Sequence, residues 1–163
     1  MVKRARLLLA EDDEALASLL EEYLLEAGYD VVVHRRGDTA LEALKQGHFD
    51  LLLSDIVMPG ADGLTLLRYI HEATDDTLTI LMTGYSGIEN ALHAVEQGAY
   101  DFVSKPFQLP EIRVRVDNAI RYQQLLRKWN EVSGDAQQYG EMTHKSGSAA
   151  VKAYGQNIDD GKY

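Results

Sequence analysis

The sequence contains no cysteine among its 163 residues. Disulfide bonds, thiolate zinc sites and cysteine nucleophiles are therefore excluded. The chain also lacks an apolar run of the about 20 residues that a membrane-spanning helix requires, because charges interrupt every apolar stretch. The opening MVKRARLLLAEDDE has too short an apolar segment for a secretory signal peptide. We expect a cytoplasmic protein that makes no membrane contact.

Basic residues are scarce in this sequence. Lys and Arg together number 16 against 26 Asp and Glu, which gives a formal net charge of −10. Binding to nucleic acid depends on cations that neutralise phosphates, so we expect no direct nucleic-acid binding by this chain. Hydrophobic residues make up 45% of the sequence, which is enough for one globular domain with an appendage.

Short apolar runs alternate with amphipathic stretches from Arg6 to about Lys128. This alternation predicts repeated strand–helix units and therefore an α/β fold with a doubly wound parallel sheet. We expect five strands, at residues 6–10, 31–34, 51–54, 78–82 and 99–103. The first, third and fourth of these are nearly all apolar, which is typical of strands that are buried on both faces.

The amphipathic stretches between the strands begin and end with residues that are typical of helix boundaries. Asp suits the N-cap position, Gly commonly ends a helix, and Pro suits the first helical turn. We expect five helices, bounded by Asp13 and Gly28, by Asp38 and Gly47, by Gly63, by Gly87 and Gly98, and by Pro110.

The fifth helix has no clear end. A helical spacing of three and four residues continues through Tyr122, Leu125, Leu126, Trp129 and Val132, which is typical of a helical linker or a short coiled coil. The alternative is that Tyr122 and Leu125 only cover the core. From Ser133 onward the composition is that of a polar tail or linker. We therefore predict a domain over residues 1–128 and a helical extension with a polar tail over 129–163.

Polar side chains follow four of the predicted strands. Because ligands bind at the carboxyl ends of the strands in doubly wound parallel sheets, these residues are candidates for a common site. The segments are Glu11-Asp12-Asp13 after the first strand, Ser54-Asp55 at the third, Thr83-Gly84 at the fourth and Ser104-Lys105-Pro106 at the fifth.

Carboxylates that lie this close repel each other unless a cation neutralises them. A cluster of oxygen ligands on short side chains suits a hard ion such as Mg²⁺, which favours phosphate as a further ligand. Lys105 would balance the charge of the empty site and pair with a phosphoryl oxygen in the filled site. Thr83 offers a hydroxyl donor, and Gly84 lets the backbone approach a bound group.

The segments LLLAEDDEAL, LLLSDIVMPGADGL, LMTGYS and GAYDFVSKPF resemble the motifs of the receiver domain of two-component response regulators. The resemblance covers residues 6 to about 125 and keeps the order of that family's motifs. The separations also match, with 43 residues from Asp12 to Asp55, 28 from Asp55 to Thr83 and 50 from Asp55 to Lys105. It implies a flavodoxin-like (βα)5 receiver fold with a five-stranded parallel sheet, here with an extended fifth helix.

The resemblance also implies how the site works. Asp55 would be the phosphoacceptor, which takes a phosphoryl group from a sensor histidine kinase or a phosphotransfer protein and forms an acyl phosphate. Glu11, Asp12 and Asp55 would hold Mg²⁺, together with the backbone carbonyl of Val57. Such a domain catalyses only its own phosphorylation and dephosphorylation, so it is a signalling module rather than an enzyme that acts on other substrates.

The remaining site residues would read the phosphorylated state. Thr83, Lys105 and Gly84 would bind the phosphoryl group, and the Lys105–Pro106 bond would be cis. Thr83 and Phe102 would act as the switch, although Phe102 could also be an ordinary core aromatic. The surface over residues 87–127 would then carry the output to a partner or an attached domain, and could support a homodimer.

Two other functions fit parts of this pattern. A receiver-like scaffold that works without phosphorylation would need none of Glu11, Asp12, Asp55, Thr83 and Lys105, so their presence counts against it. A Mg²⁺-dependent phosphatase or phosphotransferase of similar fold usually has a second acid two residues after the nucleophile, where this sequence has Val57.

Overall fold

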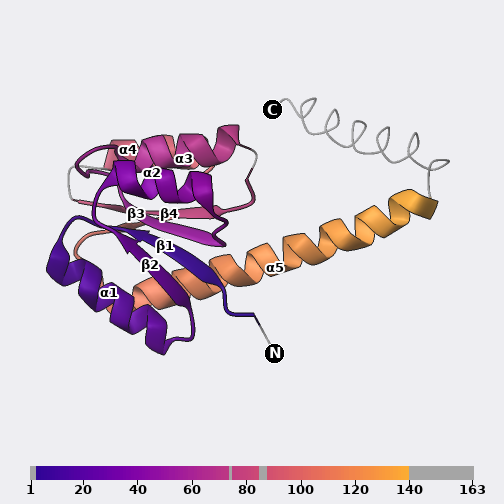
Figure 1. The fold of residues 1–163 in the computed structure, drawn as a ribbon, viewed down its shortest axis with the longest axis horizontal. Coiled ribbons are helices and arrows are strands. Elements are labelled where there is room, and N and C mark those ends of the chain that lie inside the picture. The colour runs from indigo at the N-terminus through magenta and orange to yellow at the C-terminus, as the bar shows by residue number, and fades with distance from the viewer. Residues whose placement is uncertain (1–2, 74, 85–87, 140–163) are drawn as a thin grey trace, which may run out of the picture. The chain divides into compact units, whose positions relative to one another are not determined.

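The computed structural model describes residues 3–73, 75–84 and 88–139. Strands and helices alternate along this part of the chain (Figure 1). In chain order the elements are β1 (Arg6–Ala10), α1 (Glu14–Glu26), β2 (Asp30–His34), α2 (Gly37–Gln46), β3 (Leu51–Asp55), α3 (Gly63–Glu72), β4 (Leu78–Thr83), α4 (Ile88–Glu96), β5 (Asp101–Ser104) and α5 (Leu109–Tyr139). Over the described residues, no helix is both long and apolar enough to cross a membrane.

The five strands form one parallel sheet in the order β2-β1-β3-β4-β5. The inner strands β1 and β3 each contain three consecutive buried leucines, as expected for strands covered on both faces. The predicted doubly wound α/β fold is therefore confirmed. Each predicted strand agrees with the observed one to within two residues at either end.

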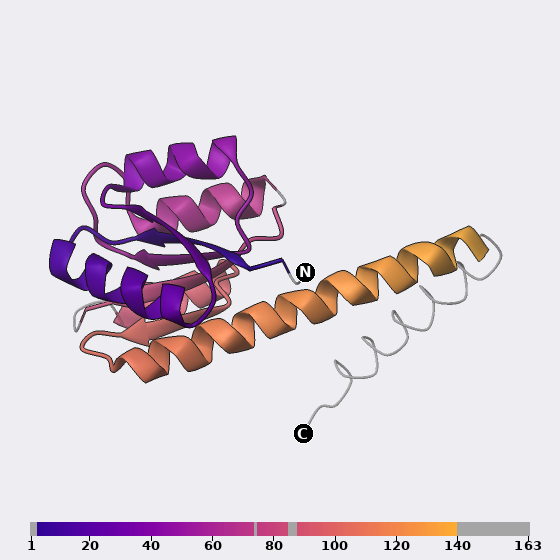
Figure 2. The same cartoon turned by 60° about the horizontal axis from the view of Figure 1, so that its bottom comes forward.

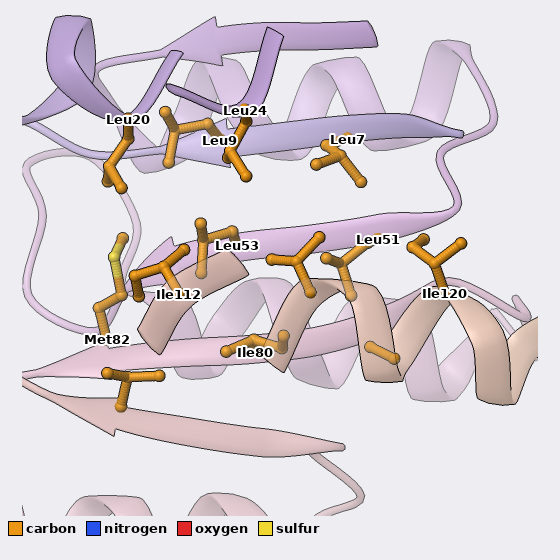
Figure 3. Close-up of a cluster of buried hydrophobic side chains, with 13 residues drawn as sticks. Leu7, Leu9, Leu20, Leu24, Leu51, Leu53, Ile80, Met82, Ile112 and Ile120 are labelled. Atoms are coloured by element: carbon orange, nitrogen blue, oxygen red, sulfur yellow. The ribbon is translucent and has the colours of Figure 1, made fainter. Parts of the chain in front are cut away.

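Helices cover both faces of the sheet (Figures 1 and 2). On one face, α1 and the first part of α5 bury Leu20, Leu24, Ile112 and Ile120 against the strands (Figure 3). On the other face, α2 and α3 pack on Leu8 and Leu52 in one cluster, and α3 and α4 pack on Leu81 in another. Each fully buried leucine contributes about 1.5–3 kcal/mol to the stability of the fold. These clusters therefore hold the strand ends firmly in place.

The predicted cap of α1 is confirmed, whereas the predicted cap of α2 is wrong. The side chain of Asp13 accepts a hydrogen bond of 3.0 Å from the backbone N–H of Leu16, as predicted for α1. The prediction that Asp38 caps α2 is wrong, because Arg36 occupies the N-cap position and Asp38 lies inside the first turn. There Asp38 pairs with the Arg36 guanidinium at 3.0 Å. The predicted start of α4 at Gly87 lies outside the described residues.

Helix α5 is the longest element, with 31 residues. Pro110 lies in its first turn, as predicted. The helix continues through Tyr139, so the expectation that a polar tail begins at Ser133 is wrong; the mostly helix-compatible residues that follow Ser133 extend the helix. Leu125 is 61% exposed and Tyr122 is 45% exposed. The ring of Tyr122 lies 5.4 Å from the ring of Tyr100, which packs against the core, so Tyr122 covers the core in part.

The chain divides into two compact units, Met1–Gln123 and Gln124–Tyr163. Within the first unit, Gln123 is buried, and its side-chain amide donates hydrogen bonds to the backbone carbonyls of Asp50 and Asp76 at 2.8 and 2.7 Å. These carbonyls lie just before β3 and β4, so Gln123 fixes α5 to the amino end of the sheet.

Candidate functional site

The polar residues predicted to gather at the strand ends do meet at one edge of the sheet. The register aligns Ala10 with Ser54 and Thr83 with Ser104. Glu11 and Lys105, which come directly after β1 and β5, therefore lie at the same edge as Asp55 and Thr83. The structure thus assembles four chain segments into one site, as expected for a parallel sheet.

The ammonium group of Lys105 joins the buried acid Glu11 and the partly buried acid Asp55. Its Nζ atom donates a hydrogen bond of 2.8 Å to Oδ2 of Asp55 and bonds of 3.0 and 3.1 Å to the two carboxylate oxygens of Glu11. The side chains of Glu11, Asp55 and Lys105 are 1%, 13% and 25% exposed. One cation therefore neutralises part of the charge of two carboxylates that are largely shielded from water.

Burial raises the pKa of Glu11 above its ordinary value, the hydrogen bond from Lys105 opposes this shift, and the negative charge of Asp55 adds to it. Burial lowers the pKa of Lys105, but its hydrogen bonds to Asp55 and Glu11 outweigh that effect, so the pKa of Lys105 lies above its ordinary value. Lys105 is therefore charged at neutral pH, while ionised Glu11 is held at a cost in folding free energy.

The acidic residues also form a set that could hold a metal ion. One carboxylate oxygen from each of Glu11, Asp12 and Asp55 lies within 4.8 Å of the others. Asp12 is exposed, whereas Glu11 is buried. A ligand set made only of carboxylate oxygens, with one open side, fits a hard divalent ion such as Mg²⁺. The backbone carbonyl of Val57 was also predicted as a ligand, and that role stays a prediction.

Thr83 and Gly84 lie at the end of β4, which pairs with the strand β3 that carries Asp55. Thr83 is 2% exposed, and its hydroxyl donates a hydrogen bond of 3.1 Å to the carbonyl of Gly84. A Cβ atom built at Gly84 would meet nothing within 4 Å, so this position leaves open space. The peptide bond between Lys105 and Pro106 is cis, as predicted.

The loop after Asp55 is fixed by contacts that sequence reasoning missed. The hydroxyl of Ser54 donates to the carbonyl of Asp55 at 2.7 Å. A Cβ atom at Gly63 would lie 2.4 Å from that same carbonyl oxygen, and one at Gly37 would lie 1.7 Å from the carbonyl oxygen of Ala61. These glycines allow a close approach between α2, α3 and the loop. Nothing in the sequence other than the glycines themselves signals that contact.

Phe102, the predicted switch aromatic, is half-buried and packs against the cluster formed by Ile56, Leu67, Leu81, Ala94 and Ala99. Its neighbour Asp101 pairs with Arg115 of α5 at 2.7 Å. On the surface over residues 87–127, apolar side chains remain exposed on α4 and α5, namely Leu92, Val95, Val114 and Tyr122. Gly87, the predicted limit of this surface, lies outside the described residues.

The raised pKa of Glu11 leads to a prediction about stability. A carboxyl group whose pKa is raised by folding favours the folded state below its unfolded pKa and loses that contribution as the pH rises through its folded pKa. At pH 7 the Glu11→Gln variant, which carries no charge there, should therefore melt higher than the wild type without metal, by a few °C or about 1 kcal/mol. Differential scanning calorimetry in EDTA measures this change.

The same calorimetry should show that Mg²⁺ raises the Tm of the wild type but not of Glu11→Gln, because a bound ligand stabilises only the state that binds it. Glu22→Gln, at an exposed position on α1, is the matched control and should behave as the wild type does. A Glu11→Gln variant that melts below the wild type in EDTA would contradict the electrostatic description of the site.

Comparisons with known proteins agree with this geometry. Residues 7–117 match the response regulator receiver domain family. The chain is 39% identical over 116 residues to the DNA-binding transcriptional regulator NtrC of Klebsiella pneumoniae, which covers 71% of this chain and 25% of NtrC. It is 32% identical over 120 residues to the uncharacterized transcriptional regulatory protein YkoG of Bacillus subtilis, which covers 74% of this chain and 53% of YkoG.

Solved structures show the same fold. The receiver domain of the Francisella response regulator 1452 superposes with a TM-score of 0.69 at 27% identity, covering 73% of this chain and 98% of that domain. NtrX from Brucella abortus superposes with a TM-score of 0.74 at 27% identity, covering 80% of this chain and 30% of NtrX. The chain spans between a quarter and about half of the curated relatives described above. The chain belongs to the response regulator receiver domain family.

Proposed function

We propose that this receiver domain, over residues 1–128, accepts a phosphoryl group on Asp55 from a partner histidine kinase or phosphotransfer protein. The observation that carries the proposal is the contact of Lys105 Nζ with Asp55 at 2.8 Å, beside a carboxylate set that includes Glu11 and Asp12. This arrangement supplies a nucleophile, a cation for the incoming phosphoryl group and ligands for a divalent ion, all at one open edge.

Each group has a distinct role in the transfer. A carboxylate oxygen of Asp55 attacks the phosphorus of the donor phosphohistidine, the P–N bond breaks, and the electron pair stays with the imidazole nitrogen. Lys105 keeps its charge and moves its hydrogen bond from the Asp55 carboxylate to a phosphoryl oxygen. Glu11, Asp12, Asp55 and the Val57 carbonyl would hold Mg²⁺, which would neutralise phosphoryl charge.

We further propose that Thr83 changes its orientation when Asp55 is phosphorylated. Its hydroxyl is bonded to the Gly84 carbonyl in this structure, and turning it toward the phosphoryl group would free the space beside β4. Phe102, packed against the α3–α4 side of the sheet, would move into that space. The exposed apolar residues of α4 and α5 would then contact a partner, an output domain or a second copy through residues 87–127.

A phosphorylation-independent scaffold is the second candidate. A scaffold would not need Lys105 to pair with the carboxylates of Glu11 and Asp55, and that pairing carries a desolvation cost. The two candidates differ in a simple experiment. The wild type is incubated with acetyl phosphate and Mg²⁺, and its intact mass is measured over time. A mass increase of one phosphoryl group that forms with Mg²⁺ and does not form when EDTA replaces it supports the proposal. An unchanged mass with Mg²⁺ contradicts the proposal.

A further inference from the structure

A second group of metal-ligating side chains lies at the amino end of the sheet, away from the edge that carries Asp55. His48 comes shortly before β3, and Asp75 and Asp76 come shortly before β4. One ring nitrogen of His48 and one carboxylate oxygen from each aspartate lie within 4.8 Å of one another. Two loops therefore bring one nitrogen ligand and two oxygen ligands to the same place.

The distances within this group are those of ligands that share an ion. Nδ1 of His48 lies 3.6 Å from Oδ1 of Asp75, and Nε2 lies 3.5 Å from Oδ1 of Asp76. Hydrogen bonds from nitrogen to oxygen are shorter, at about 2.7–3.2 Å. Two ligands that bind one tetrahedral ion at about 2.0–2.2 Å lie about 3.3–3.6 Å apart. The side chains of His48 and Asp76 are about half exposed, so small rotations can direct one ring nitrogen and both carboxylates at one ion.

Buried contacts fix the two loops relative to each other. The hydroxyl of Thr77 donates a hydrogen bond of 2.7 Å to the carbonyl of Phe49, the residue after His48. The backbone N–H of Thr77 donates one of 3.2 Å to Oδ1 of Asp75, and a carboxylate has further lone pairs for a metal. The amide of Gln123 also bridges the two loops, through the two carbonyls described above. Thr77 and Gln123 are both buried, so the candidate ligands stand on a backbone that is already ordered.

A third carboxylate lies beside the imidazole. Oδ1 of Asp50 is 3.9 Å from Nε2 of His48, and Oδ2 of Asp50 accepts a hydrogen bond of 2.7 Å from the backbone N–H of Arg6. The guanidinium of Arg6 lies over the ring of Phe49 and donates to the carbonyl of His48 at 3.4 Å. Negative charge on three sides of one imidazole favours a divalent cation beside it.

The histidine distinguishes this group from the phosphoacceptor site. The acids around Asp55 offer only oxygen ligands, which suit Mg²⁺. One imidazole nitrogen with two carboxylate oxygens suits Zn²⁺ and its neighbours Co²⁺ and Ni²⁺. We propose that His48, Asp75 and Asp76 bind a divalent ion of this zinc class, with water or Asp50 as a further ligand. The site is separate from the phosphoacceptor site and does not depend on the proposed function.

Calorimetric titration of the full chain with zinc chloride, in an excess of Mg²⁺, tests this proposal. The wild type should bind Zn²⁺ with a Kd of about 1–100 µM. His48→Gln should weaken this binding at least about tenfold, because the ion loses its nitrogen ligand. His71→Gln is the matched control, because it removes an exposed histidine of α3, and it should leave the Kd unchanged.

Two further variants make the test independent of any one substitution. Asp76→Asn should also weaken Zn²⁺ binding, whereas Asp55→Asn should bind Zn²⁺ as the wild type does. Zn²⁺ should raise the Tm of the wild type and leave that of His48→Gln unchanged, because a bound ion stabilises only the state that binds it.

Three results would overturn the proposal. The first is a wild type that binds no Zn²⁺ at concentrations up to about 1 mM. The second is an unchanged Kd in both His48→Gln and Asp76→Asn, because the ion would then lie elsewhere on the chain. The third is a loss of Zn²⁺ binding in Asp55→Asn alone, which would place the ion at the phosphoacceptor site.

Discussion

Asp55→Asn is expected to abolish the phosphoryl adduct that acetyl phosphate and Mg²⁺ produce on the wild type. The amide keeps the shape of the side chain and removes the nucleophilic charge, so the attacking atom is lost while the surrounding packing stays. Neither of the other two carboxylates described at this site can replace it. Glu11 is fully buried, and Asp12 is exposed and lacks the contact with Lys105 that Asp55 has. Intact-mass measurement over the full time course detects the loss.

Asp13→Asn is the matched control for Asp55→Asn. Asp13 lies beside the same site, but its side chain caps α1 by accepting a hydrogen bond from Leu16, and asparagine caps helices equally well. The control should be phosphorylated as the wild type is. An adduct on the Asp55→Asn variant at wild-type yield would refute the assignment of Asp55 as the acceptor.

Lys105→Met is expected to slow phosphorylation by about 10²–10³-fold, the usual effect of removing one group that stabilises charge in a transition state. It should also lower the free energy of unfolding at pH 7 by about 1–3 kcal/mol, because the buried carboxylate of Glu11 and the partly buried one of Asp55 lose their cation, while partial exposure of Lys105 limits the loss. Urea denaturation measures the second effect, and the rate of adduct formation measures the first.

The stabilisation by Lys105 has a defined pH dependence. Its pKa is raised by folding above the ordinary value of 10.5, so the contribution is fully present below about pH 10 and disappears as the pH rises through the folded pKa. The difference in stability between the wild type and Lys105→Met should therefore be constant near neutral pH and shrink in strong alkali. Lys128→Met, at an exposed position, should change neither the rate nor the stability, and an equal loss in that control would contradict the role of Lys105.

Much of this site could be predicted from the sequence because parallel strands align their carboxyl ends. Once the apolar runs of β1, β3, β4 and β5 were placed, Glu11, Asp55, Thr83 and Lys105 had to meet at one edge. These features depend on short-range patterns that each segment carries by itself.

Other features depend on contacts between distant segments and could not be predicted. The start of α2 at Gly37 is set by its approach to the loop at Ala61, where only glycine fits. Lys105 shares its hydrogen bonds between Glu11 and Asp55, and this sharing depends on how the side chains of three strands are oriented. The extent of α5 beyond Ser133 was missed because Ser133 and Gly134 are weak helix formers, so they indicated an end that the structure does not have.

The most direct test of the phosphoacceptor site is to locate the phosphoryl group. The wild type is phosphorylated with acetyl phosphate and Mg²⁺, reduced with borohydride, which converts an aspartyl phosphate to homoserine, and digested for peptide mass spectrometry. The geometry around Lys105 predicts homoserine at position 55 and at no other aspartate. Homoserine at Asp12 or Asp13, with Asp55 unchanged, would contradict it.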